Sequence, residues 1–262
     1  MADIEAVPDT TASGRPKADP AEPAPADPTR APGEMSLVDH LTELRNRLVK
    51  VFIAVGLASI VGFLLGDQIV AILKAPLPGA KPLFFTGIGD AFTIKLKIAI
   101  VVGIIIAMPV ILWQVWAFIS PGLTPSERRV VRPWLPLAMV FFALGTAIAY
   151  IVLPYAAGFL IGFETPDLQA LITAGEYFDF VTTMFLAFGL IMEFPIILFG
   201  LSRVGIVTSQ RLSGARRPAI LGIAIFAAVI TPGTDMVSPV VLGLTMYLLF
   251  EGTIFFIRRT GK

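Results

Sequence analysis

Two glutamates stand at separate places in the sequence, each among arginines. Glu43 lies in the run HLTELRNRL with Arg45 and Arg47 close by, and Glu127 is followed at once by two further arginines. A carboxylate binds a guanidinium through two parallel hydrogen bonds, so such acids can form a receptor surface for cationic side chains. A structural role is the alternative. Glu43 can pair with Arg47 one helical turn away, and Glu127 can complete a helix-capping box.

A third acid, Glu193, lies in the apolar run FGLIMEFPIIL. A charged side chain at the centre of a membrane span costs roughly 2.5–3.5 kcal/mol on insertion scales, so an acid there is a candidate functional residue. Pro195 has no backbone N–H and leaves a nearby carbonyl without its helical hydrogen bond. Together they predict a docking point for a polar group of a partner helix, with Glu193 protonated and donating. A proton relay and an internal hydrogen bond are the alternatives.

Other chemistries find no support in the sequence. The chain has no cysteine, and its one histidine, His40, stands without a cluster of further ligands. We therefore expect no metal site and no thiol chemistry. No phosphate-binding glycine motif is present, and a net charge of +1 gives no reason to expect a nucleic-acid partner. These patterns predict a protein that uses no cofactor and is not an enzyme.

The elements that must position the acids are membrane-spanning helices. Hydrophobic residues make up 56% of the chain and charged residues 15%, against about 45–50% and 25% in soluble domains. Residues 1–34 differ, since they hold seven prolines among Ala, Asp and Glu. This composition predicts a disordered cytoplasmic tail. A tail that the protein can dispense with is expected, and a functional tail is the alternative. Residues 35–262 are the predicted transmembrane domain.

The transmembrane domain begins with an amphipathic helix. Ser36 and Asp39 fit a capping box at its start, and leucines then recur at helical spacing. From residue 49 to residue 65 the chain is apolar apart from Lys50 and Ser59. We expect the first part to lie along the membrane surface and then to turn into the first span.

Five further spans are predicted, which makes a six-helix, all-α integral membrane protein. They lie at about 93–119, 134–153, 181–201, 218–230 and 237–257. Basic residues precede the first span, separate the second from the third, precede the fifth and follow the sixth, whereas the opposite loops are acidic or sparse. The positive-inside rule places the basic loops and both termini in the cytoplasm. The fifth and sixth helices are expected to be short and to thin the bilayer locally.

Prolines and four outer lysines depart from this regular pattern. Proline inside a span bends the helix, so curved spans are expected at Pro109, Pro136 and Pro195. Basic residues on the predicted outer side are Lys74, Lys81, Lys95 and Lys97. We expect the last two to extend their ammonium groups from the mouth of the second span to water.

Several segments resemble, in the family's order, TatC, the multi-spanning subunit of the twin-arginine protein translocase. They are HLTELRNRL (40–48), PVILWQVWAFISPGL (109–123), the ERR starting at Glu127, FGLIMEFP (188–195), TPGTD (231–235) and MYLLFE (246–251). Together they cover nearly the whole chain after residue 35. The loop before Glu127 differs from the family pattern, because no lysine or histidine stands just before the acid.

The resemblance implies a receptor core that binds twin-arginine signal peptides of folded cargo proteins. With the single-span subunits TatA and TatB, it would export those proteins using the proton gradient. It would be a multi-pass protein of the bacterial cytoplasmic membrane and a homo-oligomer within a receptor complex. The signal-peptide site would comprise Glu43, Glu127, Arg45 and Phe118.

The resemblance also implies roles elsewhere in the chain. Glu193 and Pro195 would dock the single-span partner, and Pro109, Asp235 and Glu251 would have minor roles. From the residues alone, Asp235 caps a turn at the outer surface, and Glu251 extends from the last span to the membrane interface.

Two other function classes predict different sequence features. A small-molecule secondary transporter predicts inverted repeats and several polar groups at mid-membrane depth. The sequence has no convincing repeat and one acid at that depth. An intramembrane enzyme would need a catalytic pair or metal ligands within its spans, which the sequence lacks.

Overall fold

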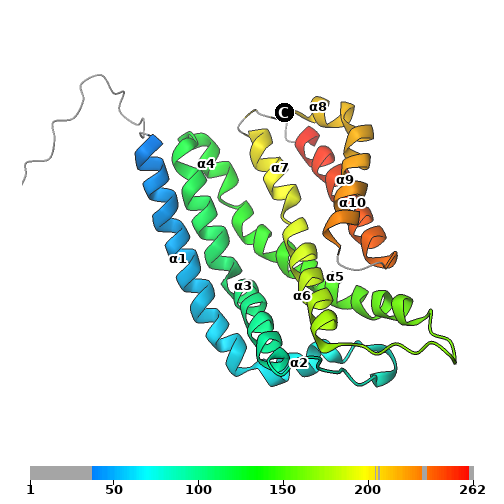
Figure 1. Ribbon diagram of the computed structural model, residues 1–262. Coiled ribbons are helices and arrows are strands. Elements are labelled where there is room, and N and C mark those ends of the chain that lie inside the picture. Colours follow the sequence, from blue (N-terminus) through cyan, green and yellow to red (C-terminus); the bar gives the residue numbers. More distant parts are fainter. Residues whose placement is uncertain (1–36, 204, 206, 232–234, 260–262) are drawn as a thin grey trace, which may run out of the picture. The chain divides into compact units, whose positions relative to one another are not determined.

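The computed structural model describes residues 37–203, 205, 207–231 and 235–259, and within these ranges its regular elements are helices. The helices are α1 (Leu37–Leu64), α2 (Gly66–Lys74), η1 (Pro78–Ala80), α3 (Asp90–Ile119), η2 (Ser120–Gly122), α4 (Pro125–Val131), α5 (Trp134–Ile161), α6 (Ala174–Ile191), α7 (Phe194–Arg203), α8 (Ser209–Gly214), α9 (Arg216–Ile230) and α10 (Val237–Arg259) (Figure 1). The predicted all-α class is confirmed. The predicted tail at residues 1–34 and the cap at Ser36 lie outside the described residues.

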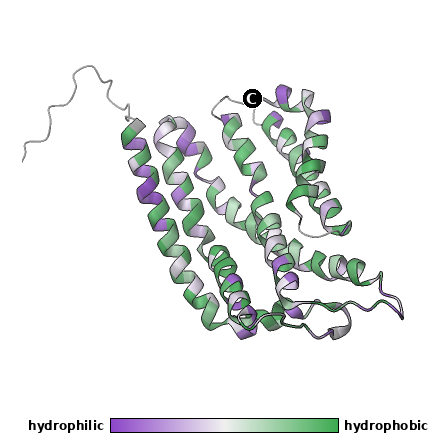
Figure 2. Ribbon diagram, viewed as in Figure 1, coloured by the Kyte–Doolittle hydropathy of each residue, from purple (hydrophilic) through white to green (hydrophobic). Residues whose placement is uncertain are grey.

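Five stretches of the described chain are long and apolar enough to cross a membrane. They are Val38–Leu64, Asp90–Gly122, Trp134–Ile161, Ala174–Arg203 and Val237–Arg259, and hydrophobic residues colour most of their length (Figure 2). The predicted fifth span, α9, has 15 residues and is about 22 Å long, against a hydrocarbon core of about 30 Å. The sixth, α10, has 23 residues and is longer than expected. Six crossings with both termini in the cytoplasm stay a prediction.

The first helix runs without interruption from Leu37 to Leu64. The sequence-based expectation of a surface helix that turns into a span is therefore corrected. No proline or tight turn interrupts this stretch, so nothing breaks the backbone hydrogen bonds where the amphipathic part meets the apolar part. Most of the helix surface is exposed. In an 18-residue apolar stretch of the α1 span 6% of the residues are buried, compared with 56% in such a stretch of Ala174–Arg203.

Small residues let α1 approach α3 closely. A Cβ on Gly62 would lie 2.9 Å from the carbonyl oxygen of Ala99, and one on Gly103 would lie 2.2 Å from the Ser59 hydroxyl. Such close backbone approach is how helices gain van der Waals contact in lipid, where the hydrophobic effect does not drive association. The crossing holds α1 against the bundle in the half of the helix farther from Glu43.

The core of the protein lies between α5, α6 and α10. Leu153, Val181, Met184 and Leu242 are completely buried there. The α5–α6 crossing depends on glycine, because a Cβ on Gly145 would lie 2.4 Å from the carbonyl oxygen of Phe188. At the start of α5, Trp134 stacks on Phe199 with ring centroids 3.7 Å apart. This stack ties α5 to α7, and Phe256 brings α10 to the same cluster.

Two connecting segments are joined at the end of the bundle that carries α2. The backbone N–H of Phe84 donates to Ile172 at 3.0 Å, and the N–H of Ala174 donates to Phe84 at 2.8 Å. The Tyr177 hydroxyl also donates to the carbonyl of Leu73 at 2.7 Å. The segment after α2 is thus bound to the segment before α6.

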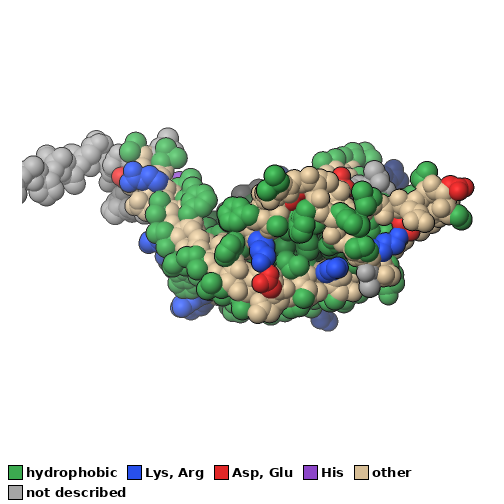
Figure 3. Space-filling view, turned by 60° about the horizontal axis from the view of Figure 1, so that its bottom comes forward, with side chains coloured by type: hydrophobic (Ala, Val, Ile, Leu, Met, Phe, Trp, Pro, Cys, Tyr) green, Lys and Arg blue, Asp and Glu red, His purple; other side chains and the backbone are tan. Residues whose placement is uncertain are grey.

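Three of the four lysines on the predicted outer side form ion pairs with acids. Lys95 pairs with Asp67 at 2.6 Å. The other two pairs are Lys81 with Glu164 and Lys97 with Asp179. Figure 3 shows basic and acidic side chains among hydrophobic ones at this end of the molecule. The hydrogen bond from Lys81 lowers the pKa of the Glu164 carboxyl below its usual value. These lysines are held by acids from other segments, which the sequence did not predict.

The topology can be tested with single cysteines, since the natural chain has none. Ser126 and Gln210 are exposed in basic connections, and Asp167 is exposed in the α5–α6 connection. An impermeant maleimide should label cysteines at Ser126 and Gln210 only after the cell membrane is permeabilised, and one at Asp167 in intact cells. Labelling of the Gln210 cysteine in intact cells would show that α9 and α10 do not form the two predicted crossings.

Gly145→Ala should destabilise the protein by about 1–3 kcal/mol, because the added Cβ overpacks the α5–α6 crossing. The measurement is the thermal unfolding midpoint in detergent. Gly222→Ala is the matched control, since a Cβ there meets nothing within 4 Å and alanine is a better helix former than glycine. An equal or higher midpoint for Gly145→Ala than for the wild type would contradict the tight crossing.

Candidate functional site

The helix after the α3–α4 connection begins with a capping box. The Thr124 hydroxyl accepts a hydrogen bond from the Glu127 backbone N–H at 3.4 Å, and the Glu127 carboxylate accepts the Thr124 N–H at 2.9 Å. Pro125 occupies the first helical position, where its missing N–H costs no hydrogen bond. The predicted cap is confirmed. It fixes the Glu127 side chain, half-buried, at the start of α4.

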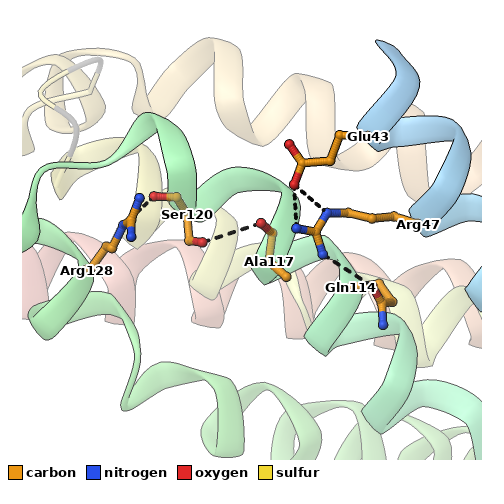
Figure 4. Close-up of polar contacts among 6 residues, drawn as sticks. All are labelled: Glu43, Arg47, Gln114, Ala117, Ser120 and Arg128. Atoms are coloured by element: carbon orange, nitrogen blue, oxygen red, sulfur yellow. Dashed lines mark hydrogen bonds and ion pairs between the residues drawn. The ribbon is translucent and has the colours of Figure 1, made fainter. Parts of the chain in front are cut away.

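Glu43 and Arg47 form the predicted pair on α1. Arg47 Nε donates to Glu43 Oε1 at 3.0 Å, and Arg47 Nη1 reaches Gln114 Oε1 on α3 at 3.4 Å (Figure 4). The pair therefore connects two helices. The second carboxylate oxygen, Glu43 Oε2, is buried and has no hydrogen-bond partner among the described residues.

An unsatisfied carboxylate oxygen favours the addition of a donor. Leaving a buried polar atom unpaired costs about 1–3 kcal/mol, and more for a charged group. The Glu43 side chain is 20% exposed, but the unpaired Oε2 is itself buried, so a cationic group from outside reaches that oxygen only when neighbouring side chains move. Glu127 lies at the same end of the bundle, in the helix that follows α3 (Figure 1). The arrangement can bind a segment with two adjacent positive charges.

The other two predicted site residues differ in their relation to Glu43. Phe118 is half-buried on α3, one turn after Gln114, and so lies on the face that Arg47 contacts. Arg45 is exposed and follows Glu43 by two residues, which places it about 200° away around α1. Sequence reasoning missed Gln114. A polar amide side chain inside an otherwise apolar run could have identified it in the sequence.

Glu193 lies at a break in the fourth predicted span. The helix α6 ends at Ile191 and α7 begins at Phe194. The acid is buried, with 7% of its surface exposed, and its Oε1 has no hydrogen-bond partner among the described residues. Pro195 is the second residue of α7, so the bend expected there is a complete interruption of the helix. Leu190 and Ile197, on either side in the sequence, are exposed to the surroundings.

The structure revises two of the three residues with expected minor roles. Glu251 forms a bidentate ion pair with Arg216 at 2.7 and 2.8 Å, which ties α10 to the start of α9. It does not extend alone to the interface. Asp235 accepts the Ser238 N–H at 2.6 Å, as a cap for α10 does. It is buried at 4% exposure rather than on the surface. Pro109 is exposed inside α3.

The family model for Sec-independent protein translocase protein (TatC) matches residues 39–244. The Sec-independent protein translocase protein TatC of Desulforapulum autotrophicum is 38% identical over 229 residues, covering 86% of this chain and 84% of that protein. The protein of the same name from Carboxydothermus hydrogenoformans is 35% identical over 223 residues, covering 84% and 92%.

The fold is also similar to a solved structure. The crystal structure of the twin arginine translocase receptor TatC in DDM superposes with a TM-score of 0.73 at 34% sequence identity. The match covers 83% of this chain and 99% of the solved chain. Sequence and fold thus agree over the region that holds Glu43, Glu127 and Glu193.

Proposed function

This chain belongs to the TatC family of Sec-independent protein translocase proteins, and we propose that it binds twin-arginine signal peptides through Glu43 and Glu127. Membership makes it a multi-pass membrane component of a bacterial protein translocase, not an enzyme. The alternative of a small-molecule secondary transporter finds no support among these relatives.

The observation that carries the proposal is the unpaired oxygen of Glu43. Arg47 satisfies Oε1 and leaves Oε2 without a donor from the described part of the chain. A second guanidinium, from the peptide, would pair with Oε2 and satisfy the buried atom. Arginine suits this role better than lysine, because its planar fork donates two parallel hydrogen bonds to a carboxylate.

Two acids suit a peptide with two consecutive arginines. In an extended segment, neighbouring side chains point to opposite faces, so one arginine can reach α1 while the other reaches the start of α4. Phe118 lies on the face of α3 next to the Arg47–Gln114 contact and would pack against an apolar residue of the peptide. Arg45 faces another side of α1, where it would contact the peptide flank.

Partner docking and the energy source complete the proposed function. Glu193 and Pro195 would receive a polar group from a single-span TatA or TatB subunit. Glu193 Oε1 is buried beside exposed apolar residues and has no partner among the residues that the structure describes. The sequence lacks a nucleotide-binding motif, and the resemblance to the family implies that export of folded cargo would use the proton gradient. Several copies of the chain would assemble in the receptor complex.

Reversal of the charge at Glu43 or at Glu127 should weaken peptide binding. Glu43→Lys and Glu127→Lys should each reduce affinity for a twin-arginine peptide by at least about tenfold, because a charge-assisted hydrogen bond contributes roughly 1.5–3 kcal/mol. The measurement is retention of the purified protein on the immobilised peptide, with a twin-lysine peptide as the weaker ligand. Equal retention on both peptides would contradict bidentate recognition.

Glu127→Gln separates recognition from capping, since glutamine keeps the cap acceptor but has no charge. Glu176→Gln is the matched control. Glu176 is also the third residue after a threonine N-cap, at the start of α6, at the opposite end of the bundle (Figure 1). We expect weaker peptide binding for Glu127→Gln and wild-type binding for Glu176→Gln. Unchanged affinity in a well-folded Glu127→Gln protein would leave only the capping role.

The docking role of Glu193 predicts different outcomes for two substitutions. Glu193→Gln keeps hydrogen bonding but cannot transfer a proton, whereas Glu193→Leu removes both functions. Export should survive in the Gln variant and fail in the Leu variant, and crosslinks from α6 or α7 to the partner helix should be lost only in the Leu variant. If the Gln variant stops export while the crosslinks persist, a proton relay replaces docking.

A further inference from the structure

Three arginines and two tryptophans line a hollow between the end of α3 and the start of α5. The cavity measures about 690 Å³, and its lining residues are Trp113, Trp116, Ser120, Arg128, Arg129, Arg132 and Pro133. No acid is among them. The hollow is therefore a concentrated positive charge beside two large aromatic side chains.

The arginines are available to an outside ligand. Arg128 Nε donates to the backbone carbonyl of Ser120 at 2.5 Å (Figure 4), which holds its guanidinium at the wall of the hollow. Arg129 and Arg132 are exposed. Within the described part of the chain, neither side chain has a hydrogen-bond or ion-pair partner. Three arginines around one cavity place like charges at its wall, so an anion in the cavity is favoured.

The position of the hollow points to the membrane surface. It opens where two candidate spans end, Asp90–Gly122 on one side and Trp134–Ile161 on the other. Tryptophan is enriched at this depth, beside lipid headgroups. From Trp113 in the hollow, a stripe of exposed apolar side chains continues along α3 to Val110 and Ile106. Their spacing of four and three residues keeps them on one face of the helix.

We propose that this hollow binds the headgroup of an anionic phospholipid. Its phosphodiester accepts hydrogen bonds from the guanidinium groups of Arg129 and Arg132, and Trp113 and Trp116 pack at the level of the glycerol. One acyl chain lies along the α3 stripe. Basic pockets between membrane helices recognise phosphate headgroups through these same forces.

The test uses the intrinsic tryptophan fluorescence of the full-length protein, to which Trp113 and Trp116 in the hollow and Trp134, next to its Pro133, contribute. The protein is reconstituted in phosphatidylcholine vesicles that contain a small fraction of brominated phosphatidylglycerol or, separately, of brominated phosphatidylcholine. Bromine quenches tryptophan at close range, so preferential quenching by the anionic lipid reports occupancy of the hollow. Wild type should show this preference. R129Q/R132Q should need about tenfold more anionic lipid for the same quenching.

The control variant R217Q/R259Q removes the same charge elsewhere and should quench as the wild type does. Arg217 starts α9 and Arg259 ends α10, and neither lines the hollow. Equal quenching by both lipids in the wild type, or an equal loss of preference in both double variants, would overturn the proposal.

Two additions test the identity of the ligand. Millimolar glycerol phosphate should leave the quenching in place, and its reversal would mean that the hollow takes a free phosphate. A saturating twin-arginine peptide should also leave it in place. Complete reversal by the peptide would show that the hollow belongs to the peptide site, and the lipid proposal would fail.

Discussion

Lipid hydrocarbon supplies no hydrogen bonds, so each polar group between the membrane surfaces must find its partner within the protein. Serine and threonine side chains meet this constraint by donating to carbonyls one turn earlier, as Thr182 does to Phe178 and Thr231 does to Ala227. Glu251 meets it by accepting hydrogen bonds from Nε and Nη2 of Arg216. Three buried acid oxygens of the described chain do not: one each on Glu43, Glu193 and Asp235. The buried side-chain atoms without a hydrogen bond in the described chain thus all belong to acids. Two of these acids, Glu43 and Glu193, belong to the proposed peptide and partner sites.

The sequence predicted the features that depend on near neighbours. The capping box at Thr124 and Glu127 follows from residue types three positions apart, and the Glu43–Arg47 pair from a spacing of four. Both are local backbone geometry. The lengths of most apolar runs likewise set the positions of the helices within a few residues. The acids at the candidate site could be identified because charge is rare in an apolar chain.

The sequence did not predict features that depend on distant segments. The outer lysines pair with acids more than eighty residues away in two of three cases, and such pairs leave no local pattern. The contact of Arg47 with Gln114 is non-local as well. The change from amphipathic to apolar residues predicts a turn in α1, but hydropathy alone does not interrupt a helix that contains no proline. The break at Glu193 was expected as a bend, since the penalty of proline can be met in either way.

The close α1–α3 crossing gives α1 the mechanics of a lever. Its fulcrum is where Ser59 meets Gly103 and Gly62 meets Ala99, and Glu43 is sixteen residues from Ser59, about 24 Å along the helix axis. A tilt of about 10° at the fulcrum therefore displaces the Glu43 carboxylate by about 4 Å. The hydrogen bond between Arg47 and Gln114 resists this swing near the end of the arm. A ligand that breaks this hydrogen bond therefore removes a contact that opposes movement of the helix end.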